Sequence, residues 1–132
     1  MRPSLLLIPS AMLLLAACQP SPEEAVAEAM SQALDALHQG NGETYVSMMA
    51  DYHSDDSLRN SLIALAVRQQ HHLDLQQHGG PTHATIDSIA LPSDTTALAF
   101  YTNHYADGDS SYCCQQLSLR EGEWKLQFGL ER

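Results

Sequence analysis

Residues 110–130, SSYCCQQLSLREGEWKLQFGL, decide the fold of this chain. Apolar and polar residues alternate on either side of Glu121-Gly122, a dipeptide typical of a tight turn. Because successive side chains of a strand point to opposite faces, the apolar residues after this turn lie on one face (Trp124, Leu126, Phe128 and Leu130). The stretch predicts two antiparallel strands, 110–120 and 123–130, whose apolar face needs cover from the rest of the chain.

The same alternation occurs in two earlier segments, residues 82–91 and 95–105. Pro92-Ser93-Asp94 separates these segments, and Asp107-Gly108-Asp109 separates the second of them from residue 110. Links this short join neighbouring antiparallel strands. The sequence therefore predicts a four-stranded antiparallel sheet from residue 82 onward.

A helix is predicted over residues 22–39. Ser21 has the N-cap position, Pro22 is the first helical residue, and Glu24 is placed to complete a capping box. Apolar residues recur at helical spacing along one side (Val26, Met30, Ala33 and Leu37), and Gly40 follows as a stop signal.

Two more helices are predicted before the sheet. One covers residues 43–50, in which the adjacent Met48 and Met49 are interpreted as core residues rather than a soft-metal site. The other begins after Asp56, closes at His78-Gly79, and places leucines on one side (Leu58, Leu62, Leu65 and Leu73). Helices followed by an antiparallel sheet predict an α+β domain with two layers.

The N-terminus has the pattern of an export signal. Arg2 precedes an apolar run that ends in Leu15, Ala16, Ala17 and Cys18, and the run is too short to span a bilayer comfortably. These four residues resemble the bacterial lipobox, in which the cysteine is lipidated before cleavage. The resemblance implies a signal peptide at residues 1–17, a lipidated tether at 18–20 and a single domain at 21–132. If the cell has two membranes, Gln19 implies the outer membrane, facing the periplasm.

The charge of the chain excludes one class of partner. The net charge is −10 over 132 residues, and it becomes more negative once Arg2 is removed with the signal peptide. A domain this acidic is repelled by nucleic acid, so nucleic acid is not an expected partner. The predicted partners are the membrane, through the lipid, and a small apolar ligand or an envelope protein.

His71, Asp74 and His78 are candidates for a metal site. They lie on the side of the last helix opposite the leucines, at spacings that bring helical residues within reach of one another. Two imidazoles and a carboxylate suit a divalent transition metal, although histidines near a helix C-terminus also favour the helix dipole. The sequence does not decide between these two interpretations, and no cofactor is predicted.

Three motifs together resemble a lipoprotein family of the nuclear-transport-factor-2-like (NTF2-like) superfamily. They are residues 21–26 (SPEEAV), residues 39–43 (QGNGE) leading into Tyr45, and residues 120–126 (REGEWKL). The superfamily includes ketosteroid isomerases and snoaL-like cyclases. The resemblance implies a cone in which helices cover a curved sheet around a pocket, but it implies no particular activity.

The predicted pocket candidates are Tyr45, His104, Phe100 and Trp124. In an alternating strand His104 shares a face with Leu98 and Phe100, so it is expected to point to the pocket, and Tyr101 is expected to point away.

Isomerase chemistry needs a carboxylate base, for which Asp87 is available. Because no convincing base-and-donor pattern is present, the chain is predicted to be a binding or interaction module rather than an enzyme, with an isomerase-like enzyme and a metal-binding lipoprotein as alternatives.

Cys113 and Cys114 are adjacent in a predicted strand. Neighbouring strand residues point to opposite faces, and their Cα atoms are too close for an unstrained disulfide. Two separate thiols are therefore favoured over a bond between the pair or a bond to another chain.

Overall fold

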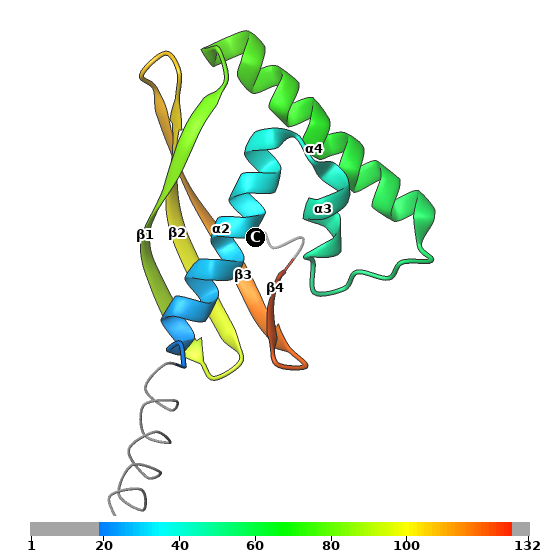
Figure 1. Ribbon diagram of the computed structural model, residues 1–132, viewed down its shortest axis with the longest axis vertical. Helices are drawn as coiled ribbons and strands as arrows, with labels where there is room; N and C mark the ends of the chain where they lie inside the picture. Colours follow the sequence, from blue (N-terminus) through cyan, green and yellow to red (C-terminus); the bar gives the residue numbers. More distant parts are fainter. Residues whose placement is uncertain (1–18, 128–132) are drawn as a thin grey trace, which may run out of the picture.

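Three helices precede four strands in the computed structural model, which describes residues 19–127 (Figure 1). The helices are α2 (Pro22–Gln39), α3 (Gly42–Ser47) and α4 (Ser57–His78), and the strands are β1 (Pro81–Ser93), β2 (Thr96–Tyr105), β3 (Ser110–Arg120) and β4 (Glu123–Leu126). The sheet is antiparallel in the order β1-β2-β3-β4. The predicted α+β fold, helices packed on a four-stranded antiparallel sheet, is confirmed. The predicted lipobox and the last strand residues Phe128 and Leu130 lie outside the described residues.

Helix α2 begins and ends where its sequence predicts. The Ser21 hydroxyl accepts a hydrogen bond from the Glu24 amide at 3.2 Å, and the Glu24 carboxylate accepts one from the Ser21 amide at 2.9 Å. This reciprocal pair satisfies two amides that a helix start otherwise leaves without partners. Gly40 ends the helix in the left-handed conformation, with φ of 70°.

The core lies between α2 and the inner face of the sheet (Figure 1). Its fully buried members come from both layers (Val26, Met30, Ala33, Leu34, Ala97, Ala99, Leu117 and Leu126 among them). Ala97 and Ala99 have no long side chains, so they let α2 lie close to β2. Trp124 packs against this core, as its predicted strand face requires.

Helix α3 is shorter than predicted and ends at Ser47 instead of residue 50. Beyond it, the chain runs beside β4: the Leu126 amide donates to the Met48 carbonyl at 2.9 Å, and the Ala50 amide donates to the Leu126 carbonyl at 2.7 Å. Met49 is thereby held in the core with 3% of its surface exposed, which confirms the predicted core role of that methionine. Sheet hydrogen bonds to β4 replace the last helical turn.

Helix α4 packs with its leucine side outward. The buried side chains of this helix are Ala64 and Val67, whereas the leucines of the predicted apolar side are exposed (Leu58 72%, Leu62 57%, Leu65 44% and Leu73 42%). A Cβ atom on Gly42, at the start of α3, would lie 2.6 Å from the Cα of Ala64. The two helices therefore touch backbone to backbone, and only small residues fit between them.

Candidate functional site

The four predicted pocket candidates are divided between two faces of the molecule. Tyr45 and Trp124 pack against the core, on the side that the helices cover. Phe100 is exposed on the other face of the sheet, where the His104 ring stacks on that of His83 at 4.5 Å. Ala97, Ala99 and Tyr101 occupy the inner face of β2 instead. The predicted orientations of Phe100, His104 and Tyr101 were therefore wrong, because α2 covers the face of β2 that carries Ala97, Ala99 and Tyr101.

Polar side chains form a row on the inner face of β2 and β3. Tyr105 and Ser111 share a hydrogen bond between their hydroxyls at 3.0 Å, and Ser111 lies 3.9 Å from the Cys113 sulfur. Asn103 donates to the same sulfur at 3.8 Å and, through its side-chain oxygen, contacts the Nε2 atom of His38 on α2 at 3.0 Å. The row joins the sheet to α2 through polar contacts.

Tyrosines beside this row are weaker acids than free tyrosine. Burial raises the pKa of Tyr101 well above its ordinary value, and the neighbouring Cys113 raises it further. Burial also raises the pKa of Tyr45. At neutral pH both phenols keep their protons and act as hydrogen-bond donors.

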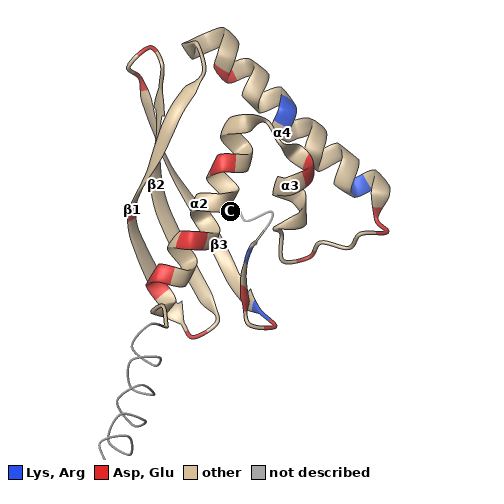
Figure 2. Cartoon of the chain, in the orientation of Figure 1, with Lys and Arg blue, Asp and Glu red and all other residues tan. Residues whose placement is uncertain are grey.

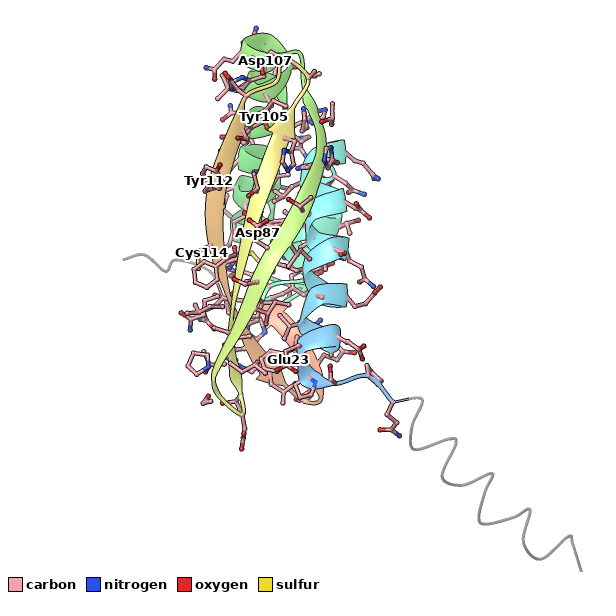
Figure 3. The ribbon with its side chains drawn as sticks, turned by 90° about the vertical axis from the view of Figure 1, so that its left-hand side faces the viewer. Glu23, Asp87, Tyr105, Asp107, Tyr112 and Cys114 are labelled. Carbon is pink, nitrogen blue, oxygen red and sulfur yellow. The ribbon has the colours of Figure 1, made fainter. Side chains whose placement is uncertain are left out.

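The carboxylate considered as an isomerase base serves another purpose. Asp87 accepts a 2.6 Å hydrogen bond from Thr102, whose side chain is buried, and Asp87 faces the outer side of the sheet (Figure 3). The hydrogen bonds among the described residues of the inner polar row involve no carboxylate. The sequence-predicted base thus lies away from the side chains that an enclosed site would use.

Grooves open at several places on the surface of the domain. A groove of about 520 Å³ lies beside the β3–β4 turn, between Tyr52, Arg120 and Lys125. Another of about 370 Å³ runs between α2 and β1, with His38 and His83 in its walls. Both grooves are open to solvent and have charged or polar walls, so neither has the enclosed apolar surface that usually surrounds a small apolar ligand.

The predicted metal-binding residues of α4 do not meet. His71 packs against Gly40 and its buried Nδ1 atom has no hydrogen-bond partner, whereas Asp74 accepts a hydrogen bond from Gln70 at 3.0 Å. His78 instead contacts Asp107 in the turn between β2 and β3 at 2.8 Å. Each of the three therefore has its own surroundings, and among the described residues only His78 belongs to a group of possible metal ligands.

His78 is the one predicted ligand that does join a cluster. Its Nδ1 atom lies 3.6 Å from Asp109 as well, and its ring stacks on Tyr105 at 4.3 Å. The Asp109 amide and, secondarily, the His78 side chain lower the pKa of Asp107 below its ordinary value of 3.8. From the sequence, Asp107-Gly108-Asp109 is recognisable only as a turn, because 29 residues separate His78 from Asp107 and no local spacing connects them.

The two adjacent cysteines, Cys113 and Cys114, are not bonded to each other. Cys113 points inward to the polar row, and Cys114 is exposed on the outer face of the sheet near Tyr112 (Figure 3). Within the described part of the chain, no helix is long and apolar enough to cross a membrane.

Solved structures of very different sequence share this architecture. A Campylobacter jejuni protein named as an NTF2-like transpeptidase matches with a TM-score of 0.67 and 11% identity, over 78% of this chain and 97% of its own. A Nostoc punctiforme domain of unknown function with a cystatin-like fold matches with a TM-score of 0.56 and 13% identity, over 82% of this chain and 75% of its own. An NTF2-like protein of unknown function from Shewanella oneidensis matches with a TM-score of 0.54 and 10% identity, over 77% of this chain and 91% of its own.

No family model matches the sequence, and no curated protein matches it either. At identities this low, the structural matches establish the arrangement of the chain and not an activity. The chain therefore has the NTF2-like, or cystatin-like, fold.

Proposed function

We propose that this chain is a lipid-anchored protein of the bacterial envelope that works by binding another protein and not by catalysis. The observation that carries the proposal is the leucine face of α4, defined as Leu58, Leu62, Leu65 and Leu73. These side chains are 42–72% exposed although they lie on one side of a single helix. An apolar surface presented in this way marks an interaction site.

The interior of the domain supports binding over catalysis. Large side chains fill the space between α2 and the sheet, and Met30, Leu117 and Leu126 are almost completely buried. The grooves are open and polar, and Asp87 is engaged with Thr102 on the outer face. The isomerase-like alternative stays a prediction, since the fold is shared by proteins of varied function.

A second copy of this chain is the partner that the charge distribution favours at the leucine face. Helix α2 carries four acidic residues and no Lys or Arg, whereas α4 carries Arg59 and Arg68 against one aspartate (Figure 2). Two copies of an acidic protein repel each other least where acidic side chains are fewest. The leucine face lies on α4, so an isologous contact through this face does not bring the acidic helices α2 of the two copies together.

The leucine face supports a weak, reversible dimer. Covering the exposed part of each leucine is worth about 1 kcal/mol, so the eight leucines of two copies contribute about 8 kcal/mol before the cost of association. Association costs at least about 4 kcal/mol, which leaves about 4 kcal/mol in favour of the dimer, so the expected dissociation constant in solution is about 1 mM. Anchoring of both copies in one membrane raises their effective concentration and favours the dimer further.

Replacement of Leu62 and Leu65 by serine is expected to abolish the dimer. Sedimentation equilibrium of the full chain in detergent, up to about 1 mM, is expected to show dimer formation by the wild type and a monomer for the double variant. Leu75→Ser is the matched control, because Leu75 is 48% exposed but lies on a different side of α4. A wild type that stays monomeric at 1 mM excludes the second copy as occupant, and loss of the dimer in the Leu75 variant would place the contact elsewhere.

The lipid anchor is tested separately at Cys18. Cys18→Ser is expected to move the protein from the membrane fraction to the soluble fraction, because the serine hydroxyl cannot replace the thiol that receives the lipid. Cys114→Ser is the control and is expected to leave the protein in the membrane fraction. Mass spectrometry of the native protein should find a mature chain that begins at a lipidated Cys18, and an unmodified residue at that position would contradict the proposal.

A further inference from the structure

Three metal-ligand atoms converge where the end of α4 meets the β2–β3 turn. They are the Nδ1 atom of His78 and one carboxylate oxygen each of Asp107 and Asp109, and all three lie within 4.8 Å of one another. The histidine comes from the last turn of a helix and the two aspartates come from a turn 29 residues further along the chain. Asp107 is visible at one end of the sheet, beside the end of α4 (Figure 3).

The surrounding contacts hold these atoms in place. The His78 ring stacks on the Tyr105 ring with an angle of 18° between their planes, which fixes the direction of Nδ1. The Ala106 amide donates to the Gly80 carbonyl at 2.8 Å and so ties the turn to the chain that follows α4. The three groups are thereby positioned by two independent segments of the fold rather than by one loop.

We propose that His78, Asp107 and Asp109 bind a divalent transition-metal ion. One imidazole nitrogen and two carboxylate oxygens form a mixed set of the kind that suits Zn²⁺, Co²⁺ or Mn²⁺, whereas Mg²⁺ and Ca²⁺ prefer oxygen alone. Asp109 is 71% exposed, so water completes the coordination shell. The site is independent of the leucine face and of the lipid anchor.

Metal binding requires only a small rearrangement. Ligand atoms at about 2.05 Å from a tetrahedral zinc ion lie about 3.3 Å apart. The His78–Asp107 distance of 2.8 Å must therefore lengthen by about 0.5 Å, and the His78–Asp109 distance of 3.6 Å must shorten slightly. Any proton on Nδ1 is released to solvent when the metal takes the nitrogen lone pair, and the two carboxylates balance the two positive charges of the ion.

The test is titration of the untagged full chain in detergent with Zn²⁺ and with Co²⁺, after alkylation of the free thiols. Isothermal titration calorimetry and the visible absorbance of Co²⁺ are expected to show one site with a micromolar dissociation constant. At a metal concentration 100 times that constant, the Tm is expected to rise by on the order of 10 °C. His78→Ala is expected to weaken binding more than 100-fold, beyond the roughly 10–100-fold that an outer hydrogen-bond partner contributes.

Matched variants separate this site from other histidines. Asp109→Asn is expected to weaken metal binding at least tenfold. Because Asp109 is exposed, this variant should fold, so it tests the site even if His78→Ala does not fold. His72→Ala removes an exposed histidine of the same helix and should leave affinity unchanged, as should His71→Ala. The proposal is overturned if the wild type binds neither ion at 1 mM, or if His72→Ala or His71→Ala weakens binding as much as Asp109→Asn does.

Discussion

Leu117→Ala is expected to lower the free energy of unfolding by about 2–5 kcal/mol, whereas Leu58→Ala should change it by less than about 0.5 kcal/mol. Leu117 is completely buried in the centre of the sheet, opposite Ala97 of β2, so truncation removes apolar contacts and leaves a cavity. Leu58 is 72% exposed, so the same truncation removes little buried surface. Urea unfolding of the two variants, with a common m-value, measures the difference.

The comparison also tests the orientation of α4. If α4 packed with its leucine face inward, Leu58→Ala or Leu62→Ala would cost several kcal/mol, as a core leucine does. The measurement is made at a protein concentration well below the dissociation constant of the dimer. A contact between copies would otherwise bury these leucines and add to the apparent stability of the protein. Equal losses for Leu117 and Leu58 would contradict the orientation described here.

Gly42→Ala is expected to destabilise the protein by about 1–3 kcal/mol. The new Cβ atom would lie 2.6 Å from the Cα and 2.8 Å from the carbonyl carbon of Ala64, and a backbone cannot move aside as a flexible side chain can. At a helical position with free space, the same substitution stabilises a protein by about 0.4–1 kcal/mol. The sign of the change therefore shows whether α3 and α4 are in backbone contact.

Gly108→Ala is the control for that experiment. No atom lies within 4 Å of a Cβ at Gly108, but φ there is 93°, so the expected cost is the backbone strain alone, about 1 kcal/mol. Hydrogen exchange gives a second readout, since only the Gly42 variant should expose the amides of α4 near Val67 to faster exchange. A stabilising Gly42→Ala substitution would show that the two helices are not in contact.

The local signals predicted the elements accurately. Ser21, Pro22 and Glu24 begin α2 because their groups satisfy amides within the same turn, and Gly40 ends the helix because it adopts a positive φ without a steric cost. The strand limits followed from alternation and turn residues, with β3 placed at 110–120 as predicted. Where a boundary was wrong, as at the end of α3, a hydrogen bond from a distant strand had replaced a helical one.

The candidate sites were predicted much less well. His71, Asp74 and His78 of α4 were considered as candidate metal ligands, but the partners of His78 in the structure are two aspartates from a turn far away in sequence. Phe100 and His104 were assigned to a pocket, yet they lie on the outer face of the sheet. The pocket error arose because periodicity identifies two faces of an element without showing which of them another element covers. The partners of His78 were missed because no local spacing connects it with Asp107.

The sequence by itself determined the order of helices and strands, the antiparallel sheet and the acidic character of the chain, because capping, alternation and charge are properties of neighbouring residues. Only the tertiary structure decided which faces are buried. Gly42 on α3, and Ala97 and Ala99 on β2, let helices approach so closely that small residues fill the contacts. Leu58, Leu62 and Phe100 are left on the surface, because they lie on the sides of α4 and β2 that face away from these contacts.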